Sequence, residues 1–454
     1  MQSPDLILQP QNYSLLTDLY QLTMSACYIG EGLADRRASF ELFVRKLPQD
    51  FGYLVAMGLE QALTYLELLQ FDSTQLEALQ ATGLFDHVPP AFWETLATAR
   101  FTGDVWAVPE GTVVFANEPL LRVEAPLWQA QVVETYLLNT LNYQTLIATR
   151  SARMRDMAGD EATLLEFGTR RAFSPQGALW AARAALAAGM DATSNVLAAL
   201  QLGQKPSGTM AHALVMALSA LEGNEDSAFA AFHRYFPNAT LLIDTYDTIA
   251  AAERLAAQVK AGALEVPGVR LDSGDLVALS QKVRSLLPET KIFASGDLDE
   301  YEILRLKQEN AQIDGYGIGT RLVTGKPVNG VYKLVEIDGI SVMKISSSKV
   351  TYPGRKQIFR QVENGRLQCD RLTLMEETDH PGEPLLKQVM QSGERVQSTE
   401  PLEIIANRVK AAIATLPNSM RQIHQPTPLE PQISSPLQTM TQETEERIQT
   451  SYVV

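Results

Sequence analysis

The chain has 454 residues, of which 45% are hydrophobic and 20% are charged, and its formal net charge is -15. This length exceeds what one hydrophobic core usually serves, so we expect two domains. The acidic balance argues against nucleic acid or an anionic membrane as a partner, because phosphate binding normally accompanies a basic excess.

Cysteine, histidine and apolar patterns exclude further classes of protein. Cys27 and Cys369 are too few for a disulfide framework, and the five histidines show no HxH or HExxH metal spacing. No run of about 18 apolar residues is present, so no membrane-spanning helix is expected. The opening stretch "MQSPDLILQPQNYS" lacks the basic and apolar regions of a signal peptide. We therefore expect a cytoplasmic protein.

Residues 1–125 mix helical and strand patterns. "NYSLLTDLYQLTMSACYIG" has apolar residues at helical spacing, "RASFELFVRKLP" alternates as a strand does, and "GTVVFANEPLLRVEAP" predicts two strands. A long helical pattern begins near Leu127. We assign residues 1–125 to the N-terminal part of a flanking α+β domain.

Residues 126–328 repeat a different pattern, in which short apolar strands alternate with helices of ten to fifteen residues. "ATLLEFGTRR", "ATLLIDTYD", "GVRLDSGDL", "KIFASGDLDE" and "IDGYGIGTRLVT" each contain such a strand. This alternation predicts a parallel sheet, and at least six repeats favour an irregular, TIM-like α/β barrel. Residues 329–454 are β-rich and then helical, and we expect them to pack with the N-terminal part as the second domain.

Three consecutive predicted strands end in small-residue turns. Ligands of parallel α/β folds lie at these carboxyl ends, where glycine allows close approach and helix N-termini attract anions. A Gly-Asp pair is also ordinary turn and helix-capping chemistry, which is the simpler interpretation of a single copy. Small-residue turns at three consecutive strand ends, together with Arg270, favour a phosphate or sugar site. The residues concerned are Asp272, Gly274, Gly296, Asp297, Gly319 and Thr320.

The chain resembles the nicotinate phosphoribosyltransferases in segments that occur in that family's order: "LLTDLYQLTM", "EFGTRRA", "SGTMAHA", "VRLDSGDL", "YGIGTRLVT" and "KISSSKVTYPGRKQIFR". The resemblance implies that nicotinate and phosphoribosyl pyrophosphate are joined to give nicotinate mononucleotide and pyrophosphate. It also implies coupling to ATP hydrolysis through a phosphohistidine, a requirement for Mg²⁺, and a homodimer with shared active sites.

The resemblance also implies residue roles. His212 would become phosphorylated, although a lone histidine beside an Ala-rich helix is otherwise more often structural. Asp272 would act at the reacting ribose, and Gly274, Gly296, Asp297, Gly319 and Thr320 would bind the phosphoribosyl group. Nicotinate would lie between Phe167 and Tyr20 of the partner subunit, with Arg170, Arg270 and Thr209 completing its pocket. No metal ligand is assigned, although Asp272 and Asp297 would hold either ribose hydroxyls or the metal ion.

Several alternatives remain open. Related nicotinamide-specific enzymes carry an acidic residue where this chain has Ser194, and its absence favours the acid substrate. A sibling enzyme acting on nicotinamide or quinolinate is one alternative, and a non-catalytic barrel that binds a phosphorylated metabolite is another. A barrel aldolase would need a Schiff-base lysine, but Lys291 lies at a strand start, the wrong end of a barrel.

Overall fold

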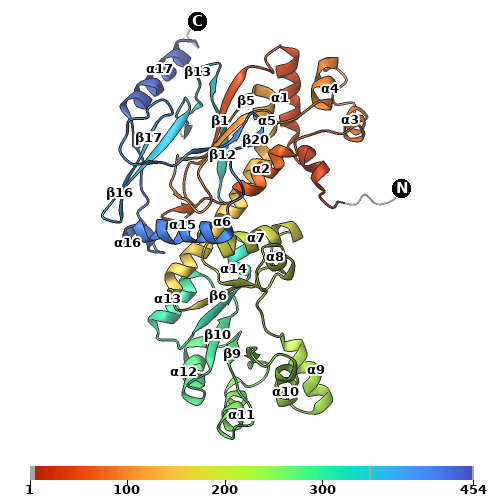
Figure 1. The fold of residues 1–454 in the computed structure, drawn as a ribbon, viewed down its shortest axis with the longest axis vertical. Helices are drawn as coiled ribbons and strands as arrows, with labels where there is room; N and C mark the ends of the chain where they lie inside the picture. Colours follow the sequence, from red (N-terminus) through yellow and green to blue (C-terminus); the bar gives the residue numbers. More distant parts are fainter. Residues whose placement is uncertain (1–5, 347–348, 452–454) are drawn as a thin grey trace. The chain divides into compact units, whose positions relative to one another are not determined.

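The computed structural model describes residues 6–346 and 349–451 (Figure 1). Residues 347 and 348, within the "KISSSKV" segment, lie outside the described part. The chain divides into two compact units. Unit 1 combines residues 1–146 with residues 327–454, and unit 2 consists of residues 147–326. The division falls inside the long helix α6, Glu134–Ala158.

The described residues of unit 1 form two larger sheets and two small ladders. The seven-stranded antiparallel sheet has the order β13 (Ile340–Ser341), β12 (Gly330–Ile337), β1 (Arg37–Val44), β5 (Pro119–Pro126), β3 (Asp104–Ala107), β19 (Lys387–Gln391) and β20 (Glu394–Arg395). The four-stranded sheet has the order β18 (Glu383–Pro384), β16 (Lys356–Glu363), β17 (Arg366–Leu374) and β21 (Gln432–Ile433). The ladders pair β2 (Leu54–Val55) with β4 (Val113–Val114), and β14 (Ile345–Ser346) with β15 (Lys349–Val350).

Helices from both ends of the chain complete unit 1. They are the 3₁₀ helix η1 (Pro10–Leu15), α1 (Leu19–Gly30), α2 (Leu59–Glu67), α3 (Ser73–Gln80), α4 (Pro90–Ala97), α5 (Leu127–Val132), α15 (Leu402–Thr415), α16 (Asn418–Arg421) and α17 (Ser435–Ser451). Strand β1 is buried at every position after its first, as a central strand should be.

Unit 1 also buries charged groups. The guanidinium of Arg360 donates to both carboxylate oxygens of Asp370, at 2.8 and 2.5 Å. Glu118 is fully buried beside this pair, and one of its oxygens accepts from the backbone N–H of Phe115 at 2.8 Å. Burial, followed by the nearby charge of Asp370, raises the pKa of Glu118 well above its usual range.

Unit 2 is built on one parallel sheet of six short strands. Its order is β7 (Ala192–Thr193), β6 (Thr163–Glu166), β11 (Gly315–Ile318), β10 (Lys291–Ser295), β9 (Gly268–Leu271) and β8 (Leu241–Leu242). All five pairings are parallel. The predicted α/β class with a parallel sheet is therefore confirmed.

A closed TIM-like barrel is not confirmed. The last strand, β11, pairs with the first, β6, as in a barrel, but no strand pairing joins β7 to β8 within the described residues. An extended segment reaches both of these edge strands instead. Ser207 donates its backbone N–H to the carbonyl of Thr193 at 2.9 Å, and the Thr209 hydroxyl donates to the carbonyl of Thr240 at 2.7 Å.

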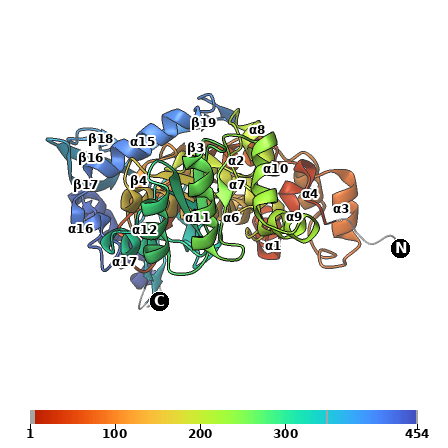
Figure 2. The same cartoon turned by 90° about the horizontal axis from the view of Figure 1, so that it is seen from below.

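Helices connect the strands of unit 2. Helix α12 packs against β9 and β10, and α11 lies beside α12 (Figures 1 and 2). The helices are α7 (Pro175–Ala187), α8 (Val196–Gln201), α9 (His212–Glu222), α10 (Asp226–Tyr235), α11 (Thr248–Lys260), α12 (Leu276–Leu286), α13 (Glu300–Gln308) and α14 (Thr320–Val323). Helix α7 buries a row of alanines, whose small side chains allow close packing. Among the described residues, no helix is both long and apolar enough to cross a membrane.

Candidate active site

The carboxyl ends of the six parallel strands gather the chemically active residues of unit 2. One residue follows each strand closely. They are Phe167 after β6, Ser194 after β7, Asp244 after β8, Asp272 after β9, Gly296 after β10 and Gly319 after β11. Since parallel strands end at the same edge of a sheet, their loops share one face of unit 2.

The two Gly-Asp turns serve different purposes. In the first, Asp275 caps helix α12 by accepting from the backbone N–H groups of Val277 and Ala278, so the simpler capping interpretation holds for this residue. In the second, the cap of α13 is Asp299, which leaves Asp297 exposed and without a capping role. Asp297 has a left-handed backbone, with φ of 49°.

Glycine is required at the second turn. Gly296 has φ of 94°, and a Cβ there would lie 2.3 Å from the carbonyl oxygen of Asp272. The chain therefore passes closer to the end of β9 than any side chain would permit. Gly274, in the first turn, is also left-handed, with φ of 83°.

Two carboxylates lie side by side at the ends of β8 and β9. The Asp272 Oδ1 accepts from the Ser295 hydroxyl at 2.5 Å. The Asp244 Oδ2 accepts from the backbone N–H of Asp272 at 2.9 Å and from the Ser273 hydroxyl at 2.8 Å, whereas its buried Oδ1 has no hydrogen-bond partner. Asp244 was not predicted from the sequence, although "LLIDTYD" has an acidic residue directly after a strand, as "VRLD" does.

His212 faces these two carboxylates from the first turn of α9. Its Nε2 lies 3.9 Å from Asp244 Oδ1 and 4.0 Å from Asp272 Oδ2. On the other side of the ring, Nδ1 lies 3.0 Å from the hydroxyl oxygen of Thr245. The side chain of His212 is 39% exposed. A histidine that was predicted from a motif alone is thus brought to the acidic strand ends.

Arg270 and Phe167 form a cationic and aromatic corner of the same face. The guanidinium carbon of Arg270 lies 6.0 Å from the centre of the Phe167 ring. The Arg270 side chain is only 14% exposed, its Nε has no hydrogen-bond partner, and its nearest carboxylate oxygen is Asp272 Oδ1 at 4.0 Å. Burial lowers the pKa of Arg270, and the positive charge of Arg170 lowers it further.

A glycine on β11 makes room for the aromatic ring. A Cβ on Gly317 would lie 2.5 Å from the ring of Phe167. Any larger residue would displace Phe167 from this edge of the sheet.

Glu166, immediately before Phe167, forms hydrogen bonds to residues at the ends of both β6 and β7. Its buried carboxylate accepts from the backbone N–H of Gly168 and from the Thr193 hydroxyl. Burial raises the pKa of Glu166. The backbone N–H of Ser194 donates to the Glu166 carbonyl at 2.9 Å. No role was predicted for Glu166, because the motif "EFGTRR" does not show that this side chain is buried.

The remaining predicted site residues occupy varied positions. Thr320 is the first residue of α14, and Thr209 uses its hydroxyl to hold Thr240. Arg170 is exposed in the loop after β6. Tyr20 belongs to unit 1, on α1, and is 47% exposed. The role of each stays a prediction.

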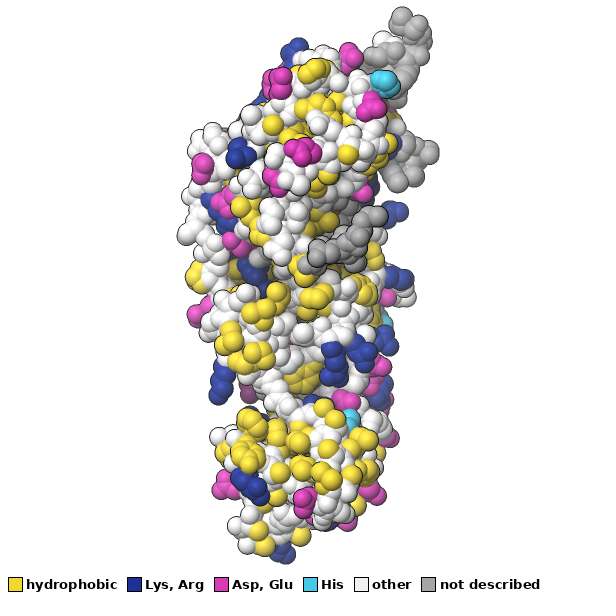
Figure 3. All heavy atoms as spheres, turned by 90° about the vertical axis from the view of Figure 1, so that its right-hand side faces the viewer, with side chains coloured by type: hydrophobic (Ala, Val, Ile, Leu, Met, Phe, Trp, Pro, Cys, Tyr) yellow, Lys and Arg dark blue, Asp and Glu magenta, His cyan; other side chains and the backbone are white. Residues whose placement is uncertain are grey.

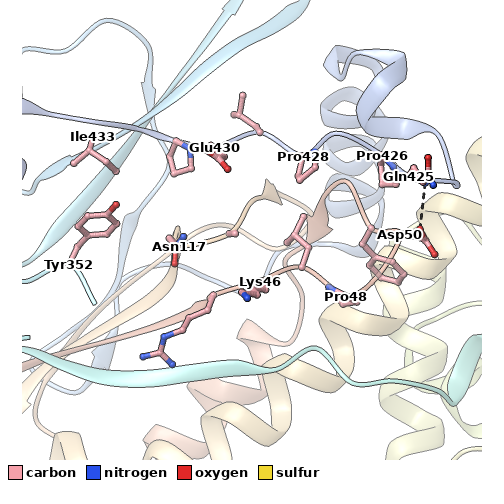
Figure 4. A pocket seen from close by; sticks show the side chains of 16 residues that line it. Lys46, Pro48, Asp50, Asn117, Tyr352, Gln425, Pro426, Pro428, Glu430 and Ile433 are labelled. Carbon is pink, nitrogen blue, oxygen red and sulfur yellow. Dashed lines mark hydrogen bonds between the residues drawn. The ribbon is translucent and has the colours of Figure 1, made fainter. Parts of the chain in front are cut away.

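Unit 1 contains a cavity of about 640 Å³ (Figure 4). Its walls come from the loop after β1, the turn at Asn117, Tyr352 and the proline-rich segment 425–431. Arg45 and Lys46 line it, and neither has a carboxylate at ion-pair distance among the residues described. Neither residue was predicted from the sequence to belong to a site.

The chemistry available at the strand ends is electrostatic. Buried cationic and acidic groups lie beside an aromatic ring and glycine turns, which suits an aromatic anion and a phosphorylated sugar. Among the described residues, no group of three or more histidine, cysteine, aspartate or glutamate side chains is arranged to hold a metal ion. Such a face, at the carboxyl ends of a parallel sheet, is where α/β enzymes bind their ligands.

Comparison with known proteins gives the family. Its three models match this chain: the nicotinate phosphoribosyltransferase N-terminal domain at residues 15–142, the family's core model at 162–370 and its C-terminal domain at 378–441. The chain therefore belongs to the nicotinate phosphoribosyltransferase family and is a phosphoribosyltransferase enzyme. The resemblance drawn from the sequence segments is confirmed.

Individual relatives cover most of the chain. Nicotinate phosphoribosyltransferase pncB2 of Mycobacterium tuberculosis is 41% identical over 422 residues, which are 90% of this chain and 89% of that protein. The Bacillus subtilis nicotinate phosphoribosyltransferase is 45% identical over 384 residues, covering 80% of this chain and 76% of its own. The crystal structure of human nicotinic acid phosphoribosyltransferase matches with a TM-score of 0.83 at 29% identity, over 94% of this chain and 99% of that one.

Proposed function

We propose that this enzyme transfers the phosphoribosyl group of phosphoribosyl pyrophosphate to nicotinate, and that ATP hydrolysis drives the reaction through a phosphorylated His212. The observation that carries the proposal is Arg270, a buried guanidinium without a hydrogen-bonded carboxylate, beside the ring of Phe167. A buried cation whose nearest carboxylate lies at 4.0 Å is incompletely compensated until an anion binds. Nicotinate supplies both a carboxylate for Arg270 and a pyridine ring for Phe167.

The nicotinate pocket follows from this pair. Arginine binds a carboxylate with two parallel hydrogen bonds, and Arg170 adds positive charge close by. Stacking on Phe167 contributes about 0.5–1.5 kcal/mol beyond burial, and we assign the other face of the ring to Tyr20 of a second subunit. Thr209 and Ser194 complete the pocket. Ser194 carries no charge, so it does not repel the nicotinate carboxylate.

The phosphoribosyl group belongs at the neighbouring strand ends. Glycine turns let backbone N–H groups approach phosphate oxygens, which suits Gly274, Gly296 and Gly319 together with Thr320. Carboxylates bind sugar hydroxyls, and Asp272 and Asp297 are in position after β9 and β10. With the phosphate at the glycine turns and the base on Phe167, carbon C1 of the ribose would face the base.

The reaction needs little proton transfer. The pyridine nitrogen attacks the ribose carbon C1 while the bond from C1 to the pyrophosphate oxygen breaks. Positive charge builds on the sugar in the transition state, when the old bond is largely broken and the new bond is incomplete. Positioning and electrostatic stabilisation should therefore dominate the rate. The carboxylate of Asp272 is the group best suited to the positive charge on the sugar.

Magnesium fits the same strand end. Mg²⁺ is usually held by one or two carboxylates together with substrate phosphates, and Asp272 offers a partly exposed carboxylate for this purpose. When bound, the ion neutralises the departing pyrophosphate. A site of this kind requires no cluster of three protein ligands.

Coupling to ATP rests on His212. Imidazole is a competent nucleophile for phosphoryl transfer, and the ring is partly exposed beside two carboxylates. A phosphoryl group on His212 would lie near the sugar-binding strand ends, so its hydrolysis can be linked to binding and release of substrates.

Two structural features belong to the same proposal. We infer that unit 2 is an irregular barrel, whose seam between β7 and β8 is filled by residues 205–210, as the hydrogen bonds of Ser207 and Thr209 support. We also infer a homodimer. Helices α9 and α10 and the residue that follows α10 expose Met216, Leu221, Tyr235 and Phe236. Apolar side chains gather on one face of unit 2 in Figure 3.

The experiment compares product formation by the wild type and two variants. The wild type should make nicotinate mononucleotide from nicotinate and phosphoribosyl pyrophosphate, and ATP should accelerate it. His212→Ala should keep a slow reaction that ATP no longer accelerates, whereas Asp272→Asn should be slow with and without ATP. ATP stimulation that survives in His212→Ala would contradict the phosphohistidine.

A further inference from the structure

A side chain from the long helix α6 supports the turn that follows β11. The Nη1 of Arg150 donates to the backbone carbonyl of Arg321 at 2.8 Å and also to the backbone carbonyl of Thr324. Both carbonyls belong to the end of α14, where a helix leaves its last carbonyl groups without a helical partner. The guanidinium of Arg150 therefore closes the C-terminal end of a helix that has only four residues.

A glycine leaves room for this contact. Gly325 has a φ of 129°, in the region that favours glycine. A Cβ at this position would lie 2.4 Å from Nη2 of Arg150 and 3.0 Å from its Cζ. Any other residue would push the guanidinium away from the backbone. Two residues far apart in the sequence thus serve a single contact.

The other end of α14 belongs to the proposed phosphate site. Gly319 precedes the helix and Thr320 is its first residue. The backbone N–H of Leu322 donates to the Gly319 carbonyl at 3.0 Å, and that of Thr324 donates to the Thr320 carbonyl at 3.1 Å. A helix this short is not stable by itself, so its geometry depends on contacts from outside. Holding its last carbonyls in place also holds its first residues.

We propose that Arg150 is a positioning residue for the phosphoribosyl group: its guanidinium supports α14 from behind and keeps Gly319 and Thr320 in the geometry that receives the 5-phosphate. The part of this inference that concerns phosphate rests on the proposed function. Arg150 acts through α14, since its Nη1 is directed at backbone carbonyls. Its loss should weaken the binding of phosphoribosyl ligands and leave the binding of nicotinate intact.

The first test measures the turn itself and needs no substrate. Hydrogen–deuterium exchange of the full-length protein is followed in the peptide that covers α14. We expect the backbone amides of residues 322–324 to exchange at least about tenfold faster in Arg150→Met, because losing a charge-assisted hydrogen bond corresponds to such a factor. Gly325→Ala should show the same change, since its Cβ displaces the guanidinium while the charge remains. Unchanged exchange in Arg150→Met would overturn the proposal.

The second test separates the two substrates. Steady-state kinetics give the KM for phosphoribosyl pyrophosphate and for nicotinate, with ribose 5-phosphate and pyrophosphate as competing inhibitors. We expect the KM for phosphoribosyl pyrophosphate and the inhibition constant of ribose 5-phosphate to rise about tenfold in Arg150→Met. The KM for nicotinate and the inhibition constant of pyrophosphate should stay unchanged, and Arg150→Lys, which keeps a donor, should restore part of the loss. Equal rises in both KM values would overturn the positioning role.

Another arginine of α6 provides the matched control. Arg155 donates to the backbone carbonyls of Gly159 and Gly189 at 2.9 Å and to that of Ala162 at 2.6 Å. These carbonyls precede β6 and β7, so they lie at the opposite ends of the strands from the site. Arg155→Met should lower the free energy of unfolding without changing either KM. A rise in the KM for phosphoribosyl pyrophosphate in this variant as large as in Arg150→Met would overturn the proposal.

The two tests distinguish this inference from the proposed function. If the wild type binds no ribose 5-phosphate, the proposed phosphate site fails and the phosphate part of this inference is overturned with it, while the exchange measurement still decides whether Arg150 holds α14. If the wild type and Arg150→Met bind ribose 5-phosphate equally well, the proposed phosphate site stands and the role of Arg150 is overturned.

Discussion

Replacing Arg270 by methionine removes the charge that the proposed carboxylate pocket depends on while keeping a side chain of similar length. A charge-assisted hydrogen bond contributes about 1.5–3 kcal/mol, which corresponds to a factor of about 10–150 in affinity. We therefore expect Arg270→Met to raise the KM for nicotinate by at least about tenfold. The preference for nicotinate over nicotinamide should fall by a similar factor, because nicotinamide has no carboxylate for the Arg270 charge to bind.

The same substitution should have little effect on the stability of the free enzyme. The Arg270 side chain is 14% exposed, its Nε has no partner, and its nearest carboxylate oxygen lies at 4.0 Å. Removing this buried charge relieves its desolvation cost but gives up a weak attraction to Asp272, 4.0 Å away, so we expect the free energy of unfolding to change by less than about 1 kcal/mol. Steady-state kinetics with both bases and urea denaturation measure the two effects.

A matched arginine in unit 2 provides the control. Arg284 is paired with Asp314 at 2.5 Å, on the loop that precedes β11 and thus away from the carboxyl ends of the strands. Arg284→Met should lower the free energy of unfolding and leave the KM for nicotinate unchanged. An unchanged KM for nicotinate in Arg270→Met would refute the carboxylate pocket.

Three further predictions test other parts of the account. Gly317→Ala should raise the KM for nicotinate by up to about tenfold, because its Cβ would lie 2.5 Å from the Phe167 ring; an unchanged KM would show that the ring does not contact the base. His212→Ala should consume no ATP during turnover, measured as ADP released per nucleotide formed, and stoichiometric ADP would exclude its phosphorylation. Glu118→Gln should change how stability depends on pH. Burial beside Asp370 raises the pKa of Glu118, so the folded wild type retains a proton that the unfolded chain loses above about pH 4.3. The stability that this proton contributes is complete below that pH and is lost as pH rises. Melting temperatures should therefore fall more steeply with rising pH in the wild type than in the variant, and parallel curves would contradict the shift.

The parallel sheet of unit 2 was predictable because its strands and helices have strong local signals. β9, β10 and β11 are four or five residues long and are followed by glycine turns, so their carboxyl ends could be located from letters alone. β7 and β8 have two residues each, too few for any periodic pattern. The segment that reaches both of them has no regular structure, and its hydrogen bonds to Thr193 and Thr240 depend on tertiary contacts.

The candidate site was predictable where a residue type is unusual for its position. Arg270, within a buried strand, and His212, within a recognisable motif, are examples. Asp275 and Asp272 look equivalent in "VRLDSGDL", yet only the first caps a helix, and that distinction needs the backbone. Asp244 and Thr245 were missed because their significance lies in the approach of His212, 33 residues earlier than Thr245, and no local pattern records that approach.

The most direct test of the central claim is the initial rate of pyrophosphate release from phosphoribosyl pyrophosphate with nicotinate or nicotinamide at equal concentration, with Mg²⁺ and with or without ATP. The account predicts rapid release with nicotinate, faster with ATP, and little with nicotinamide. Release that is faster with nicotinamide, or absent with nicotinate, would contradict it.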